Sequence, residues 1–248
     1  MYSELYFGDE SRKKMQIMID DIKSVFRERL ETVKWMTSST RQMALKKFDR
    51  FNTKIGHPKI FRDYSSLEIQ ADDFMGNVLR SIRFEINRRL ARVGAPVDKN
   101  EWEMSPPTVN AYFSPSDNEI VFPAGILQPP FFDHDIDDAV NYGAIGAVIS
   151  HEITHGYDDQ GRMYDAEGNI RDWWNDGDKT EFKRRAKLVV DLYDSKEVLP
   201  GIHVHGERTV GENIADFGGI NIAYAALKKR LKLNSHDNRE IDGLTPEQ

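Results

Sequence analysis

Two histidines four residues apart, His151 and His155, have a spacing that suggests chemistry. In a helix, this spacing places both imidazoles on one face, one turn apart, so that both can reach a single metal ion. Glu152 follows the first histidine and can act on water beside the metal without being a ligand. This H-E-x-x-H pattern is typical of zinc hydrolases, and the alternative is a chance histidine pair on an ordinary helix.

A catalytic zinc site needs a third protein ligand and one position left open for water. The candidates are His134, His203, His205 and the acidic residues. Glu212 and Asp216 are favoured, because they are four residues apart at the start of a second expected helix and therefore face the same way. Glu212 can bind zinc, while Asp216 can accept the second ring N–H of a ligating histidine and fix its tautomer.

A competing interpretation of Glu212 is a helix cap. Thr209-x-x-Glu212 fits a capping box, in which the glutamate would bond back to its own N-cap N–H. We favour ligation because the box does not explain Asp216. His203 and His205 lie near a Pro-Gly turn and are expected to be loop residues.

The composition excludes several other functions. The chain has 248 residues, enough for one large domain or two small ones, and its net charge of -7 argues against a nucleic acid partner. It has no apolar run long enough for a membrane span, and its start lacks the pattern of a signal peptide. It has no cysteine, which excludes Cys-ligated zinc and is compatible with a reducing compartment. The localisation stays open, with the cytoplasm favoured.

Apolar residues at helical spacing predict three helices in the first hundred residues, and their apolar stripes are expected to be core. The three are residues 11–36, a second helix stopped by Gly56 and Pro58, and residues 71–93. Residues 109–113 and 119–122 flank a polar five-residue turn and predict a β-hairpin.

The histidine helix and two later helices follow the hairpin. Asp133 or Asp135 is the expected cap of the histidine helix, and Gly143 and Gly146 within it suggest close packing against a neighbour. We expect a helix over residues 181–193, begun by Asp178 or Thr180, and another from Thr209. Residues 234–248 predict no clear element.

Four stretches together resemble the neprilysin-like family of zinc metallopeptidases, which includes endothelin-converting enzymes and bacterial oligopeptidases. They are residues 109–112, 120–131, 151–159 and 211–216, in the family's order, and the resemblance runs through almost the whole chain. It implies that His151, His155 and Glu212 bind one zinc ion. It also implies that Glu152 is the general base of peptide hydrolysis and that Asp216 orients a histidine.

The resemblance also implies a peptide substrate and its binding residues. Asn110 and Ala111 would hydrogen-bond the backbone of a peptide lying along an edge strand. Ile126, Phe131 and Val148 would form the walls of an apolar pocket for the residue after the scissile bond. The implied fold is α+β, mainly helical: a zincin-like (thermolysin-like) catalytic lobe with a small β-element. We expect a single lobe over residues 1–248, with 1–100 packed on the histidine helix and 105–248 supplying the hairpin and zinc-site helices.

The chain departs from the family in length. Family members usually have a helical cap domain before the equivalent of Met1 and continue past the equivalent of Gln248. The continuation carries a histidine that stabilises the tetrahedral intermediate and an arginine that binds the substrate's C-terminal end. His205 stands where the family often has asparagine and is not assigned that missing role.

The chain therefore resembles a piece of the catalytic lobe, incomplete at both ends. An expressed fragment, a proteolytic fragment and one product of a split gene all stay open as its origin. The expected function is a zinc-dependent peptidase acting on oligopeptides. The alternative is a zinc-binding subunit with little activity alone, which needs a second polypeptide carrying the missing segments.

Overall fold

The structure is a computed structural model that describes residues 1–233, 240 and 243–245. The prediction for residues 234–248 thus lies mostly outside the described residues. The chain divides into two compact units, residues 58–103 and the remainder. The elements of the larger unit are α1 (Tyr2–Tyr6), α2 (Asp9–Thr32), α3 (Ser38–Asp49), β1 (Asn52–Gly56), β2 (Tyr112–Ser114), β3 (Glu119–Pro123), α5 (Asp138–Asn141), the π-helical turn η1 (Tyr142–Gly146), α6 (Ala147–His155), the 3₁₀ turn η2 (Gly161–Met163), α7 (Asp176–Asp194), β4 (Glu197–Leu199), β5 (Ile202–His203) and α8 (Val210–Leu233).

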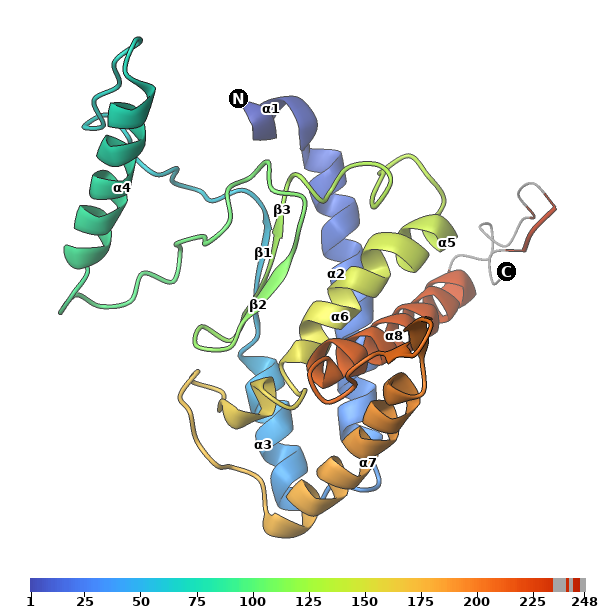
Figure 1. Cartoon of the computed structure of the whole chain (residues 1–248). Helices are drawn as coiled ribbons and strands as arrows, with labels where there is room; N and C mark the ends of the chain where they lie inside the picture. The colour runs from blue at the N-terminus through green and yellow to red at the C-terminus, as the bar shows by residue number, and fades with distance from the viewer. Residues whose placement is uncertain (234–239, 241–242, 246–248) are drawn as a thin grey trace. The chain divides into compact units, whose positions relative to one another are not determined.

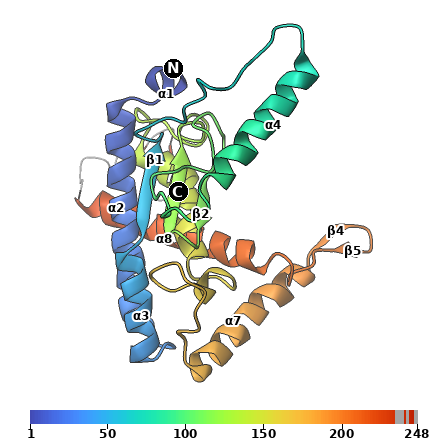
Figure 2. The ribbon, with the colours of Figure 1, turned by 90° about the vertical axis from the view of Figure 1, so that its left-hand side faces the viewer.

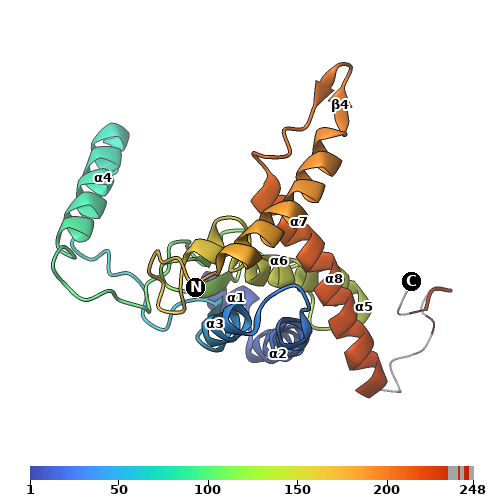
Figure 3. The same cartoon turned by 90° about the horizontal axis from the view of Figure 1, so that it is seen from below.

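The predicted fold class, α+β and mainly helical, is confirmed (Figure 1). Helix α2 lies along one side of the larger unit and packs against α3, α6 and α8 (Figure 3). Its apolar stripe is core, as predicted: Met15, Met18 and Ile22 are at most 1% exposed. Burying each such side chain contributes about 1.5–3 kcal/mol to stability. The helix that carries the two histidines therefore rests on a packed support.

A three-stranded sheet lies beside α2, with the strand order β1-β3-β2. The predicted hairpin is confirmed, because β2 pairs antiparallel with β3. Strand β1 pairs parallel with β3 and runs alongside α2 (Figure 2). The expectation that a helix continues to Gly56 is wrong, since α3 ends at Asp49 and β1 follows. Strand β3 is buried along its whole length, whereas β2 is an edge strand of this sheet.

The histidine helix is built from three consecutive segments, α5, η1 and α6. Its cap is Asp137, whose Oδ1 accepts a hydrogen bond from the Val140 N–H, so the expected cap at Asp133 or Asp135 is wrong. Close packing against a neighbour is wrong for Gly143, which is exposed, whereas Gly146 is buried next to Met18 of α2. A methyl group at Gly143 would meet nothing within 4 Å, and one at Gly146 would make only ordinary van der Waals contacts. Both glycines lie in the wide turn η1, which interrupts regular α-helix before the site.

The C-terminal end of helix α7 leads into the hairpin of β4 and β5. Its N-terminal end is hydrogen-bonded to the start of α3 (Figure 2). Its cap is Asn175, not Asp178 or Thr180. Asp178 is buried and accepts hydrogen bonds from the Thr37 N–H, the Thr37 hydroxyl and the Asn175 amide. Burial raises the pKa of Asp178, but the hydrogen bonds from Thr40, Thr37 and Asn175 outweigh it and lower the pKa overall.

Replacing Asp178 tests this junction. We expect Asp178→Asn to cost about 1–3 kcal/mol of stability, because the amide turns a donor toward the donors that the carboxylate satisfies. The folded pKa is lowered, so this contribution is present above the unfolded pKa and is lost as the pH falls below about 4. Urea unfolding at pH 7 and pH 3 measures both effects. Asp176→Asn, at a fully exposed carboxylate two residues away, is the control. Equal losses in the two variants would contradict the assignment.

The smaller unit, residues 58–103, contains α4 (Phe74–Leu90), capped by the Asp73 carboxylate. The expectation that its apolar stripe is core is not met within this unit taken by itself. No residue of α4 is buried, and Phe74 is 77% and Leu79 62% exposed. Periodicity shows that a helix has an apolar face but not what covers it. The expectation of one single lobe over residues 1–248 stays a prediction.

Candidate metal centre

His151 and His155 lie on one face of α6, as their spacing predicts. Their ring centroids are 4.5 Å apart, with the ring planes nearly perpendicular, and their Nε2 atoms are 2.9 Å apart. The opposite face is core, where Ile149 and Ile153 are fully buried. Both imidazoles are mostly but not fully covered, so they open toward the surface beside α8.

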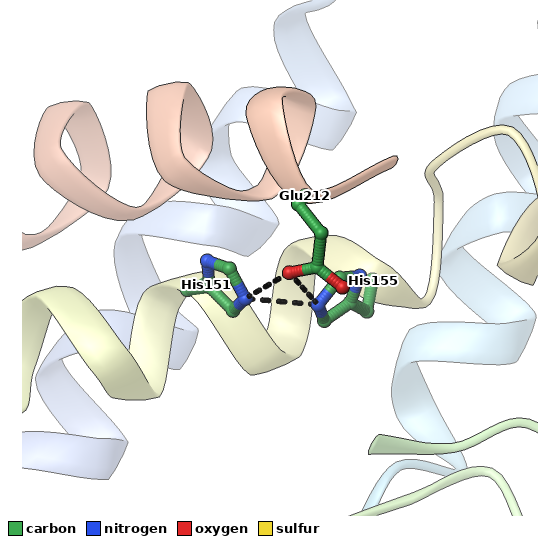
Figure 4. A group of neighbouring side chains, drawn as sticks. All are labelled: His151, His155 and Glu212. Atoms are coloured by element: carbon green, nitrogen blue, oxygen red, sulfur yellow. Dashed lines mark hydrogen bonds and ion pairs between the residues drawn. The ribbon is translucent and has the colours of Figure 1, made fainter. Parts of the chain in front are cut away.

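Glu212, in the first turn of α8, reaches across to both imidazoles (Figure 4). Its Oε2 lies 3.3 Å from the His151 Nε2 and 3.5 Å from the His155 Nε2. A capping box would place the Glu212 carboxylate near Thr209, but it lies at the two histidines. The Thr209 hydroxyl accepts a hydrogen bond from the Asn213 side-chain amide. Helices α6 and α8 pack against each other, which brings Glu212 next to histidines that are far from it in the sequence.

The Nδ1 atom of each imidazole, on the side of the ring away from the cluster, is hydrogen-bonded to a carboxylate. The Nδ1 of His151 lies 2.8 Å from Asp216 Oδ1, and the Nδ1 of His155 lies 2.7 Å from Asp158 Oδ2. An ionised carboxylate only accepts, so each Nδ1 carries the proton and each Nε2 lone pair faces the cluster. Asp216 is where the sequence places it. Sequence reasoning misses Asp158, although its spacing of three residues from His155 at the end of the helix is a signal that indicates the contact.

The donor set fits zinc. Two imidazole nitrogens and one carboxylate oxygen converge, with oriented tautomers, and the Glu212 side chain is 68% exposed, so one side of the cluster is open. The other candidate ligands are elsewhere. His134 lies with Asp133 and Asp135 instead, and His203 and His205 are exposed.

Glu152 is 7% exposed and is directed at the edge strand. Its carboxylate accepts a hydrogen bond from the Phe113 N–H of β2. Burial raises the pKa of Glu152 to about 7, with Glu212 adding to the rise and His155 opposing it. A buried carboxylate with such a pKa, beside the two imidazoles, can take up and release a proton near neutral pH.

The residues expected to bind a peptide fall into two groups. Asn110 and Ala111 directly precede the edge strand β2, and Asn110 Oδ1 accepts a hydrogen bond from the Ala111 N–H. Ile126 belongs to the hydrophobic core, Val148 packs against that core, and Phe131 is 37% exposed. The structure therefore places the first group at an edge able to pair with another strand. The pocket formed by the second group stays a prediction.

Two histidines and a glutamate that converge from two helices, with a further glutamate directly after the first histidine, are the arrangement typical of zinc hydrolases. Sequence models of peptidase family M13 match residues 110–248 and, with the N-terminal model of the same family, residues 1–58. The chain belongs to peptidase family M13. The resemblance to neprilysin-like metallopeptidases is thereby confirmed.

Individual relatives agree with this assignment. The chain is 43% identical over 248 residues to an endothelin-converting enzyme homolog of Locusta migratoria. That match covers 97% of this chain and 34% of the relative. The zinc metalloprotease Zmp1 of Mycobacterium tuberculosis, solved with an inhibitor, is 47% identical with a TM-score of 0.90, over 98% of this chain and 38% of that one.

A structure of PepO from Lactobacillus rhamnosis is 34% identical with a TM-score of 0.85, over 91% of this chain and 36% of that chain. The likeness to these peptidase structures confirms the expected zincin-like fold. The chain spans about a third of the length of these relatives.

Proposed function

We propose that this chain carries the zinc site of a metalloendopeptidase that hydrolyses peptide bonds of oligopeptides. The observation that supports it most is the convergence of His151, His155 and Glu212, whose ligand atoms all lie within 4.8 Å of one another. Zinc as the metal is supported by membership of peptidase family M13 and by the similarity to Zmp1, which is a zinc metalloprotease. In this proposal one zinc ion binds per chain, and these three residues hold it.

Bound zinc supplies a Lewis acid that polarises the scissile carbonyl and makes water a better nucleophile. Glu152 takes the proton from the attacking water and delivers it to the leaving amine. Asp216 and Asp158 keep each histidine in the tautomer that presents Nε2. The hydrogen bond from the Phe113 N–H holds the Glu152 carboxylate next to β2, which is the edge where a peptide would lie.

In the same proposal the substrate backbone lies along β2, by addition of a strand to the sheet edge. Asn110 and Ala111 supply hydrogen bonds to that backbone at the start of the strand. Ile126, Phe131 and Val148 contact the side chain after the scissile bond. The substrate is thus an extended peptide segment.

A second candidate function is a zinc-binding subunit that needs a second polypeptide. It is favoured by one observation: the cluster is open on the α8 side, where the Glu212 and Asp216 side chains are exposed. Loss of one preorganised donor to the transition state costs about 10²–10³ in rate. A chain with a complete metal set but incomplete transition-state contacts would bind zinc normally and hydrolyse slowly.

Metal removal distinguishes the two functions. We expect the purified chain to bind zinc stoichiometrically and to cleave a short internally quenched peptide, with activity lost to a chelator and restored by zinc. Stoichiometric zinc without cleavage, but with cleavage after addition of a polypeptide carrying the missing family segments, establishes the second function. A folded chain that binds no zinc would contradict both. Zinc is measured by elemental analysis and cleavage by fluorescence.

A further inference from the structure

Lys47, on α3, is a fully buried lysine that the proposed mechanism does not use. Its ammonium donates to three backbone carbonyls: Gly156 O at 2.7 Å, Gly161 O at 2.7 Å and Tyr164 O at 2.9 Å. An ammonium has three N–H donors, so every one finds an acceptor. Burial lowers the pKa of Lys47 to about 7, and the carboxylates of Asp158 and Asp165 act against that fall.

These carbonyls all belong to the segment that follows the histidine helix. Gly156 comes directly after His155, Gly161 is the first residue of η2, and Tyr164 directly follows η2. The segment thus folds around the ammonium at the negative end of the α6 dipole, where a cation is favourable. A Cβ at Gly161 would lie 1.8 Å from the His155 carbonyl oxygen, so glycine is required for the segment to return this close.

The same segment carries the carboxylate that orients His155. Asp158 Oδ2 lies 2.7 Å from the His155 Nδ1, while its Oδ1 accepts from the backbone N–H groups of Gln160 and Gly161. The position of Asp158 therefore depends on where Gly161 is held. The Lys47 ammonium donates to the carbonyl oxygen of Gly161, and the N–H of the same residue donates to Asp158.

Lys47 also contacts the hairpin. Its own carbonyl oxygen accepts a hydrogen bond of 2.9 Å from the Asn118 amide, in the turn between β2 and β3. Asn118 is 2% exposed and has a positive φ of 52°, so this turn is fixed in a specific backbone conformation. One residue thus bonds both the segment with Asp158 and the hairpin whose edge strand holds Glu152.

We propose that Lys47 is a positioning residue of the metal site, which fixes Asp158 and through it the orientation and tautomer of His155. This inference rests on the proposed zinc function, because its consequence is the affinity of the site for zinc. Lys47 contacts neither the metal nor the substrate. It acts through the three carbonyls, which would be buried without a donor if an apolar side chain replaced it.

The test compares Lys47→Met with Lys46→Met. Lys46 is the neighbouring lysine on α3, half-exposed, and pairs with Glu167 of the same segment at the surface. We expect Lys47→Met to weaken zinc binding by about 10-fold or more, the range for loss of outer-shell support, and Lys46→Met to stay close to the parent chain. Competition with a chromophoric chelator gives the affinity, and the d–d spectrum of the Co²⁺-loaded chain reports ligand geometry.

A second readout needs no metal. In the zinc-free parent chain, at a pH high enough for the His155 imidazole to be neutral, ¹⁵N NMR should show the Nδ1–H tautomer, and in Lys47→Met a mixture of tautomers. Lowered unfolding stability with unchanged affinity, cobalt spectrum and tautomer would overturn the proposal and leave Lys47 a packing role. If the parent chain binds no zinc, the proposed function fails, and the tautomer comparison alone decides the role of Lys47.

Two further variants cover the remaining outcomes. Where Lys47→Met does not fold, Lys47→Arg carries the test, because it keeps the charge but cannot match the three carbonyls with a planar group. We expect an intermediate loss of affinity, and a parent-like Kd and tautomer in folded Lys47→Arg would overturn the proposal.

Asp158→Asn combined with the Lys47 variant should lose less affinity than the sum of the two single losses, since both act on His155. Additive losses would contradict the route through Asp158.

Discussion

Glu152→Gln is expected to lower peptide hydrolysis by about 10²–10⁴-fold, the contribution of a general acid–base group, while zinc content stays at the parent level. The amide has nearly the shape of the carboxylate and can still accept from the Phe113 N–H, so the local structure should be kept. What it loses is the ability to take a proton. The comparison uses the preparation in which chelator-sensitive cleavage is seen, whether the chain alone or the chain with a complementing polypeptide.

Zinc content and rate must be measured on the same sample, because only their combination identifies a general base. Glu167→Gln, at a surface carboxylate that pairs with Lys46 and Arg50, is the matched control and should leave both unchanged. If Glu152→Gln loses zinc together with activity, Glu152 is a ligand or a support of one. If it cleaves at the parent rate, another group moves the proton.

The cluster of His151, His155 and Glu212 was predictable because each part follows from local rules. Four-residue spacing fixes one face of a helix, and both histidines use it. The position of Glu212 in the first turn of a second helix limits where its side chain can reach. The crossing of α6 and α8 itself does not follow from local patterns, and the family resemblance supplied it.

The parts that sequence patterns missed depend on contacts between distant residues. Strand β1 is five residues long and pairs in parallel with β3, sixty-seven positions later at Asn52 and Glu119, so no local alternation indicates it. The apolar stripe of α4 has the pattern of a core helix, but residues 58–103 by themselves do not bury it. Lys47 has the sequence context of a solvated lysine between Lys46 and Phe48. Its burial follows from a segment more than a hundred residues away folding around it.

The second large effect is on the metal itself. We expect Glu212→Ala to weaken zinc binding by more than about 100-fold, beyond the 10–100-fold range for loss of an outer-shell partner. Alanine removes the anionic ligand and leaves two neutral imidazoles, and an open site with two ligands holds zinc poorly. Asp216→Asn, one turn along α8, should lie within the 10–100-fold range, because Asp216 contacts only the far side of the His151 ring.

The order of these two losses is the informative result. Glu212 and Asp216 are both exposed carboxylates on the first turns of α8, so a general effect of negative charge near the histidines would lower affinity about equally in both variants. A ligand and an orienting group would not behave equally. Glu207→Ala, an exposed carboxylate just before α8, controls for charge at this end of the helix. Stoichiometric, tightly held zinc in Glu212→Ala would place the third ligand elsewhere, and the convergence of the two helices would then lose its proposed role.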